Sequence, residues 1–447
     1  MDPSKGKTVE SFGSGAVCTK QRRIAELAKK SPTMVLTTLA HHMDVEWLRE
    51  AYDRTRKDGA VGVDGQTAAD YEAELEENLR SLLERAKSGR YRAPPVRRVH
   101  IPKGDGKETR PLGIPTFEDK VLQRAVVMLL EPIYEQDFRD CSYGFRPGRS
   151  AHQALEGLWR ETMGMRGGWV IDLDIRKFFD SLGHGHLKTI LRQRVGDGVV
   201  LRLISKWLHA GVLEDGRLTH SERGSPQGGV ISPLLANVYL HEVLDTWFEQ
   251  MVRPRMRGRC ALVRYADDAV LVFERHNDAD RVMRVLPKRF EKYGLTLHPD
   301  KTRLVRFQPP ADRRSKESDD DARRGTFDFL GFSHFWAKSR KGSWVVKRKT
   351  AKNRFTRALR MLSQWCRRHR HWPVAEQWRM LCRKLRGHYA YYGIIGNHRS
   401  LDHLRWRTER IWQKWLNRRS WAPMLWERFQ RLLARLPLPP ARLSASR

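Results

Sequence analysis

The stretch Ala261–Phe273 constrains this chain more than any other, because it reads as a β-hairpin with an acidic tip. Its sequence, ALVRYADDAVLVF, has two apolar runs on either side of a short polar turn, which is the pattern of two paired strands. An Asp-Asp pair often does no more than satisfy turn geometry, but these strands are too apolar to flank an ordinary surface turn. We therefore predict a hairpin that presents Asp267 and Asp268 at its tip.

A second acidic strand is predicted earlier in the chain. Residues Trp169–Asp174, WVIDLD, alternate apolar and acidic positions, as a strand with one buried face does. Asp174 ends this strand, so two strand-borne acidic sites can meet at one edge of a sheet. Asp172 is in phase with Asp174 and, like Asp180, is a weaker candidate for a part in the same site.

Three converging carboxylates suit the polymerisation of nucleotides. In that reaction a primer 3′ hydroxyl attacks an α-phosphorus, and two divalent ions about 3.5–4 Å apart stabilise the attacking and leaving oxygens. Magnesium prefers carboxylate oxygens and keeps positions open for phosphate. The sequence therefore predicts two Mg²⁺ ions per active site, held by Asp174, Asp267 and Asp268.

Charge is distributed unevenly along the 447 residues. The net charge is +33, and the segment 331–447 holds 29 Lys and Arg but only 4 Asp and Glu, together with ten of the fifteen Trp. Cations interleaved with aromatic rings favour a nucleic acid over a membrane surface as the partner, although many of these tryptophans are expected to be helix core and a basic face can simply be solvated. Crowded cations predict RNA binding by Lys347, Arg348, Lys349, Arg367, Arg368 and Arg370.

The pattern of elements indicates an α+β fold. Strands are expected at 91–115, 169–174 and 261–273, with helices between them and long basic helices from 348 onward. We predict a right-hand polymerase fold, with fingers and an antiparallel palm sheet followed by an all-α thumb. The expected domains are an N-terminal extension with the first fingers region (1–90), fingers and palm (91–335), a helical thumb (336–420) and a short basic tail (421–447). The sequence has no apolar run of about 18 residues, no secretory signal and no CxxC pair, so a cytoplasmic protein that does not contact membranes is expected, associated with the nucleoid when bound to nucleic acid.

Seven motifs, in order, resemble those of group II intron-encoded reverse transcriptases and maturases of the bacterial type. The resemblance covers about 37–420. The motifs are RPLGIP (110–115), SYGFRPG (142–148), DIRKFFD (174–180), GSPQGGVISPLLAN (224–237), YADD (265–268), the blocks from Gly294-Leu295 to Lys301-Thr302, and FLGF (329–332).

The resemblance implies a role for each matching residue. Asp174, Asp267 and Asp268 would be the catalytic metal ligands. Phe178 would crowd the sugar 2′ carbon and so reject ribonucleotides, although core packing is the alternative. The other residues implied to bind the nucleotide are Gln227, Arg110, Lys301 and Lys103, the last of which is as readily a solvated turn lysine. Phe329, Leu330 and Gly331 resemble the primer grip, with a buried hairpin as the alternative.

The C-terminal third resembles the maturase-specific thumb of the same family over 350–397, including LRGHYAYYG at 385–393. That likeness implies binding of the group II intron RNA, promotion of splicing and mobility, and use of an RNA template, a DNA primer and dNTPs. A homodimer is left open. The cysteine pairs of an HNH nuclease do not follow the thumb, so second-strand cleavage is not expected.

Three alternatives share parts of this pattern. The first is a retron, diversity-generating or CRISPR-associated reverse transcriptase, which the GGVISPLLAN block and the thumb disfavour. The second is a splicing-only maturase that has lost polymerase activity, which the intact set of three aspartates disfavours. The third is an RNA-dependent RNA polymerase, which Phe178 disfavours.

Overall fold

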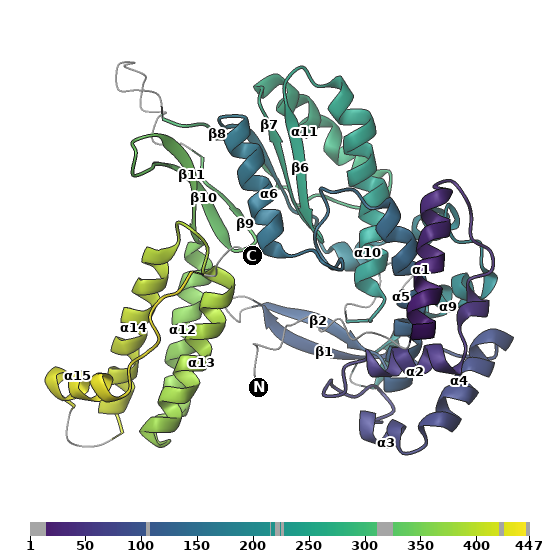
Figure 1. The fold of residues 1–447 in the computed structure, drawn as a ribbon, viewed down its shortest axis with the longest axis horizontal. Coiled ribbons are helices and arrows are strands. Elements are labelled where there is room, and N and C mark those ends of the chain that lie inside the picture. Colours follow the sequence, from purple (N-terminus) through teal and green to yellow (C-terminus); the bar gives the residue numbers. More distant parts are fainter. Residues whose placement is uncertain are drawn as a thin grey trace. The chain divides into compact units, whose positions relative to one another are not determined.

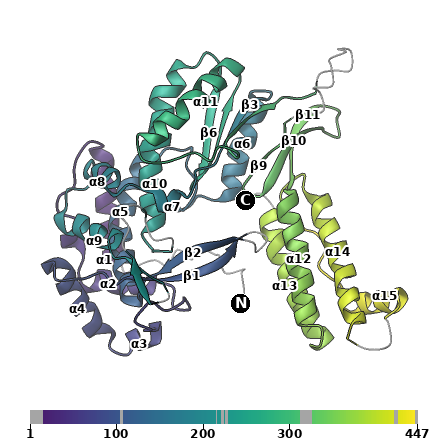
Figure 2. The same ribbon diagram turned by 180° about the vertical axis from the view of Figure 1, so that it is seen from behind.

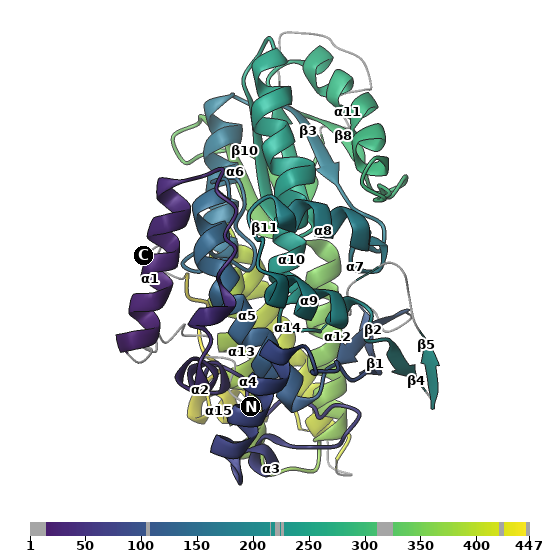
Figure 3. The ribbon, with the colours of Figure 1, turned by 90° about the vertical axis from the view of Figure 1, so that its right-hand side faces the viewer.

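A computed structural model describes residues 15–103, 108–214, 216–219, 224, 228–310, 325–419 and 424–443. The chain forms two compact units, Ser11–Leu304 and Val305–Arg447, and each is described by itself. Figures 1, 2 and 3 show the elements of both units from three directions. Among the described residues, none of the helices combines the length and the apolar character needed to cross a membrane.

The first unit begins with helices gathered on α5 (Phe117–Asp137). This helix is buried on nearly all sides, as expected for a helix that is apolar all round. The indole N–H of Trp47, on α2, donates to the carbonyl of Ala125 on α5 at 3.0 Å. Side-chain caps begin several of these helices: Asp44 accepts from the backbone N–H of Trp47. The helices are α1 (Gly15–Lys30), η1 (Ala40–His42), α2 (Val45–Asp53), α3 (Ala68–Glu72) and α4 (Leu75–Ser88).

A small four-stranded sheet has the order β2-β1-β4-β5. Its long strands β1 (Val96–Lys103) and β2 (Glu108–Ile114) are antiparallel, as the sequence predicted. Pro111, which cannot donate a backbone hydrogen bond, lies on the edge strand β2, where that donor is not needed. The short strands are β4 (Val212–Glu214) and β5 (Arg217–Thr219).

The sheet that carries the acidic strands has the order β6-β7-β3-β8. The predicted hairpin is present as β6 (Cys260–Tyr265) and β7 (Asp268–Phe273), and the predicted acidic strand as β3 (Gly168–Leu173). Every residue of β7 after Asp268 is buried, because helices pack against this sheet: α6 (Ala151–Gly164) contacts β6, and α11 (His276–Glu291) contacts β3 and β7. The edge strand β8 (Arg303–Phe307) contains the boundary between the two units.

Further helices complete the first unit. The helix α10 continues into two π-helical segments, η2 and η3, a widened geometry that is uncommon and is found most often at functional sites. These elements are α7 (Phe178–Ser181), α8 (His184–Arg192), α9 (Gly198–Leu208), α10 (Ser232–Leu240), η2 (His241–Thr246), η3 (Phe248–Val252) and η4 (Arg253–Arg255).

The second unit combines a three-stranded sheet, of order β11-β10-β9, with four helices. The helices share their own apolar core, which includes Leu362, Leu385 and Trp412. The first part of the expected helical thumb (336–420) holds residues of β10 and β11, which pair as a hairpin of β-branched and aromatic residues. Helices were expected from residue 348 onward, and the first one begins at Lys352. The elements are β9 (Phe327–Phe329), β10 (Phe332–Lys338), β11 (Trp344–Thr350), α12 (Lys352–Arg368), α13 (Val374–Tyr392), α14 (His398–Asn417) and α15 (Trp426–Arg435).

Candidate active site

The three aspartates lie at the same end of the β6-β7-β3 sheet. Leu173 on β3 is paired with Ala269 on β7, so the next positions along the two antiparallel strands are Asp174 and Asp268. Asp268 also closes the hairpin with Tyr265. Asp267 is in the two-residue turn between them. The strand register therefore brings together aspartates that are far apart in the sequence.

Electrostatics at this end of the sheet reflect the crowding of carboxylates. Burial raises the pKa of Asp267, and the negative charge of Asp174 raises it further, while Arg110 and Arg264 oppose the shift. Asp174 is partly exposed and pairs with the Lys301 ammonium at 3.5 Å.

Backbone contacts hold Asp174 in place. Its carbonyl accepts a hydrogen bond from the backbone N–H of His298 at 2.8 Å and one from the hydroxyl of Thr302 at 3.2 Å. The segment that supplies Lys301 is thereby tied to the end of β3. The predicted nucleotide-binding lysine and the predicted metal ligand are thus neighbours, although 127 positions apart in sequence.

The arrangement of these carboxylates bears on whether they could hold a metal ion. Within the ranges that the structure describes, no three His, Cys, Asp or Glu side chains are gathered closely enough to hold an ion. The donor chemistry nevertheless fits magnesium, because hard carboxylate oxygens from β3 and from the hairpin tip face mutual repulsion that a divalent cation relieves. The half-exposed Lys301 side chain pairs with one carboxylate oxygen of Asp174.

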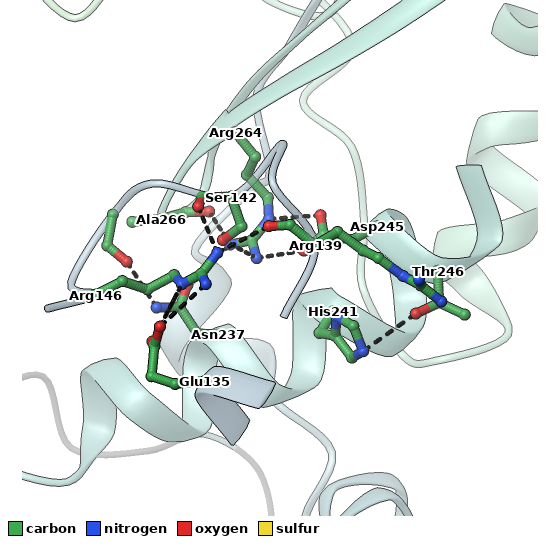
Figure 4. Close-up of polar contacts among 11 residues, drawn as sticks. Glu135, Arg139, Ser142, Arg146, Asn237, His241, Asp245, Thr246, Arg264 and Ala266 are labelled. Carbon is green, nitrogen blue, oxygen red and sulfur yellow. Dashed lines mark hydrogen bonds and ion pairs between the residues drawn. The ribbon is translucent and has the colours of Figure 1, made fainter. Parts of the chain in front are cut away.

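Arg264, which sequence reasoning passed over, contacts Ala266 of the acidic turn within a cluster of polar residues (Figure 4). Its side chain and that of Asp245 are both 0% exposed. The two form a bidentate ion pair, with Nε to Oδ1 at 2.7 Å and Nη2 to Oδ2 at 2.6 Å. Arg264 also donates to the carbonyl of Ala266, the first residue of the turn, at 2.9 Å. The remaining donors reach Asn237 Oδ1 at 2.9 Å and Ser142 Oγ at 2.7 Å, so all five N–H groups are used.

This network joins three of the sequence motifs at one point. Asn237, from the GSPQGGVISPLLAN block, donates to the carbonyl of Gly144 in SYGFRPG at 2.7 Å. A Cβ on Gly144 would lie 2.3 Å from the backbone nitrogen of Ala266, so only glycine allows this approach. Ala266 itself has a φ of 57°, an unfavourable region for a residue with a Cβ. The sequence feature that could have identified Arg264 is its position as a single charged residue within an apolar strand. A charge buried there needs buried hydrogen-bond partners.

The other predicted nucleotide-binding residues differ in their exposure and in whether the structure describes them. Arg110 is exposed on β2, and its charge lowers the pKa of Asp267. Phe178 is 3% exposed and belongs to the main apolar core, with its ring edge-on to Phe179 at 5.2 Å. The packing alternative for Phe178 is therefore present in the structure. Gln227 and the side chain of Lys103 lie outside the described residues.

The predicted primer grip is a tight hairpin turn in the second unit. Phe329 ends β9 and is buried, while Leu330 and Gly331 have φ values of 49° and 81°, the signs expected in a type I′ turn. Tyr391 donates its hydroxyl hydrogen to the carbonyl of Leu330 at 2.8 Å. A Cβ on Gly331 would lie 2.9 Å from the hydroxyl of Tyr392. The buried hairpin that the sequence left open is thus observed, held by α13.

The predicted RNA-binding cations differ in how far they are exposed. Arg348 is only 9% exposed and pairs in register with buried His334, because alternation along β11 turns it to the opposite face from its neighbours. Lys349 is exposed, with its ammonium 5.0 Å from the centre of the Phe335 ring. Three of the others remain accessible to different degrees: Arg367 and Arg368 are exposed at the end of α12, and Arg370 is partly exposed. Lys347 is partly exposed on β11.

Comparison with known proteins places this chain in a family. The profile described as "Reverse transcriptase (RNA-dependent DNA polymerase)" matches residues 101–334. Protein YkfC of Escherichia coli (strain K12) is 37% identical over 284 residues, which are 56% of this chain and 74% of that protein. The group II intron-encoded protein LtrA of Lactococcus lactis subsp. cremoris is 46% identical over 176 residues, 39% of this chain.

Intron-encoded and maturase relatives are matched over a limited part of their length. Only 29% of LtrA is covered. The nuclear intron maturase 2, mitochondrial, of Arabidopsis thaliana is 30% identical over 177 residues, 31% of this chain and 24% of that protein. The profile nevertheless spans more than half of this chain, and the resemblance found in the motifs is confirmed. The chain belongs to the reverse transcriptase (RNA-dependent DNA polymerase) family and is of the group II intron reverse transcriptase and maturase type.

Proposed function

We propose that this protein polymerises DNA on an RNA template, with Asp174, Asp267 and Asp268 as its catalytic carboxylates. The observation that carries the proposal is the strand register that brings all three to one end of the β6-β7-β3 sheet. Two magnesium ions held there would stabilise the attacking primer oxygen and the leaving pyrophosphate oxygen.

The surrounding cations suit a triphosphate. Arg110 is close enough to Asp267 to lower its pKa, and Lys301 pairs with Asp174. With metal bound at the carboxylates, Arg110 and Lys301 would be available to the phosphate oxygens of an incoming dNTP, where they would neutralise charge that develops in the transition state. Lys103 and Gln227 complete the proposed nucleotide site.

The parts of a polymerase hand can be assigned to segments of the two units. We assign fingers and palm to the first unit, with the β6-β7-β3-β8 sheet as the palm. The β9-β10 turn, Phe329–Gly331, is the proposed primer grip, and the helices from α12 onward are the proposed thumb. Residues 331–447 carry 25 of the 33 net positive charges of the chain, which supports binding of the phosphate backbone of an intron RNA.

Promotion of splicing and mobility is the second part of the proposal. It is supported by the intron-encoded relatives and by the exposed cations at the end of α12. The same RNA would then act as template, with a DNA primer and dNTPs as the other substrates. Accessible Arg367, Arg368 and Lys349 are better candidates for RNA contact than buried Arg348.

Primer extension with magnesium on a structured RNA tests the polymerase assignment. We expect Asp267→Ala to lower the extension rate by more than about a hundredfold, because loss of a group that only supports a metal ligand already costs 10–100-fold. RNA binding should be retained. The matched control is Asp140→Ala, which removes a side chain that is 96% exposed. Wild-type protein that binds intron RNA but extends no primer would instead identify a splicing-only maturase.

Sugar selection tests the role of Phe178. If its ring excludes the 2′ hydroxyl, Phe178→Leu should raise ribonucleotide incorporation relative to dNTP incorporation. Leucine is preferred over alanine here, because truncation of a buried Phe to Ala costs about 3–5 kcal/mol of stability. An unchanged ratio in a folded variant would leave core packing as the only role of this ring.

A further inference from the structure

A pocket opens among the helices α12, α13 and α14 of the second unit. It encloses about 740 Å³ of empty space, its open mouth included. Its lining includes three buried leucines, one indole ring and two exposed cations. These residues are Leu362, Leu385, Leu404, Trp365, Arg368 and Lys384.

The aromatic side of the pocket is built from neighbouring rings on one helix end. Trp365 is stacked on His369, with ring centres 4.7 Å apart and planes 17° apart. The ammonium of Lys384 lies 5.5 Å from the centre of the Trp365 ring. A partly exposed indole with an exposed lysine beside it offers a surface for a flat, anionic ligand.

One polar group of the lining has an unused hydrogen-bonding capacity. The Nε2 of His388 is buried and has no partner among the described residues, and the ring is stacked on Tyr392 at 4.4 Å. Burial lowers the pKa of His388 to about 4, so the ring is neutral near pH 7. A neutral imidazole nitrogen either donates or accepts according to its tautomer, and it would pair with the edge of a heterocycle once the atoms that cover it move aside.

We propose that this pocket receives a single unpaired base of bound RNA, with the adjoining phosphate at Arg368 and Lys384. An apolar floor, an aromatic wall and one polar group are the features that hold a base removed from its stack. The proposal rests on the RNA-binding function proposed above. It adds that recognition depends on an unpaired base and not only on backbone charge.

Binding of two RNA probes to the full-length protein tests the pocket. The probes are a 20-nucleotide oligoadenylate and a 20-base-pair RNA duplex, at one salt concentration. Trp365→Leu should weaken oligoadenylate binding by between about fivefold and about 150-fold, the range that corresponds to the stacking of one base. Duplex binding should be unchanged, because a duplex presents no free base.

Two further variants separate a lost pocket from a damaged fold. Ala358→Phe fills the pocket from its partly exposed wall without removing any ring, and it should weaken oligoadenylate binding as Trp365→Leu does. Trp406→Leu is the matched control, since this ring is 47% exposed on α14 and does not line the pocket. It should leave both affinities within about twofold.

The outcomes distinguish failure of the pocket from failure of the proposed function. If Trp365→Leu and Ala358→Phe bind oligoadenylate as tightly as wild type, or lose duplex binding equally, the pocket is not a base site even though the protein binds RNA. If wild-type protein binds neither probe, the RNA-binding function itself is wrong. Loss of primer extension in wild type would contradict the polymerase assignment alone.

Discussion

Replacement of Arg264 by Met should destabilise the first unit by about 3–5 kcal/mol, because it leaves the Asp245 carboxylate buried without a counter-charge. Both side chains are 0% exposed and share two hydrogen bonds shorter than 2.8 Å. Removal of the arginine also takes a donor from Asn237, Ser142 and the carbonyl of Ala266. Each buried acceptor left unpaired costs up to about 1–3 kcal/mol.

The double variant Arg264→Met with Asp245→Leu separates charge burial from the positioning of the turn. Apolar replacement of a whole buried ion pair is often neutral in stability, so the double variant should recover most of the free energy of unfolding. Primer extension should not recover, since the carbonyl of Ala266 still lacks its donor. Arg264→Lys, which keeps the charge but not the planar fork, should fall between wild type and Arg264→Met in both measurements.

Urea unfolding followed by tryptophan fluorescence measures the first quantity, and steady-state extension at saturating dNTP the second. If Arg264→Met lowers the free energy of unfolding by less than about 1 kcal/mol, the Asp245 carboxylate has found solvent or another partner, and the predicted cost of burying it is wrong. A double variant that extends primers at the wild-type rate would contradict the second prediction. In that case the hydrogen bond to the turn would have no part in activity.

Three further outcomes are expected. Burial raises the pKa of Asp119 from its ordinary value to about 7. The protonated carboxyl of Asp119 therefore contributes its full stability below about pH 4, and this contribution is lost as pH rises through 7. Asp119→Asn should gain up to about 4 kcal/mol over wild type between pH 4 and pH 8 in urea unfolding. Both ring nitrogens of His334 are buried without a partner among the described residues. His334→Phe should raise the free energy of unfolding by about 1–3 kcal/mol, and a loss would show that a bound water satisfies the ring. Gly144→Ala should abolish primer extension because its Cβ would meet the backbone of Ala266, whereas Gly185→Ala, which meets nothing within 4 Å, should extend normally.

Much of the active-site scaffold was predictable from local pattern. Alternation identified the strand that ends at Asp174, and the apolar runs around YADD identified the hairpin, since a strand repeats every two residues and its turn must be polar. The clustering of cations after residue 330 was visible in composition alone. These features depend on neighbours in sequence, which is why they could be predicted.

Errors arose where burial depends on distant partners. Helices were expected from residue 348 onward because the basic residues 348 and 349 were grouped with the helices that follow, but these residues lie in β11, which pairs with β10. Arg348 was grouped with partly exposed Lys347 and exposed Lys349, yet its strand face is covered. Neither the pairing of β10 with β11 nor the burial of Arg348 can be predicted from the composition of the segment alone.

The sequence by itself determined the family and the excess of positive charge in the C-terminal third, and it predicted the three acidic residues of the candidate site, because motif order and charge require no coordinates. Only the tertiary structure decided that Arg264 is the support of the acidic turn and that a pocket lies among α12, α13 and α14. The physical reason is that a buried charge and a pocket are both defined by what surrounds them. Those surroundings come from segments up to 122 positions away, as in the contact of Arg264 with Ser142.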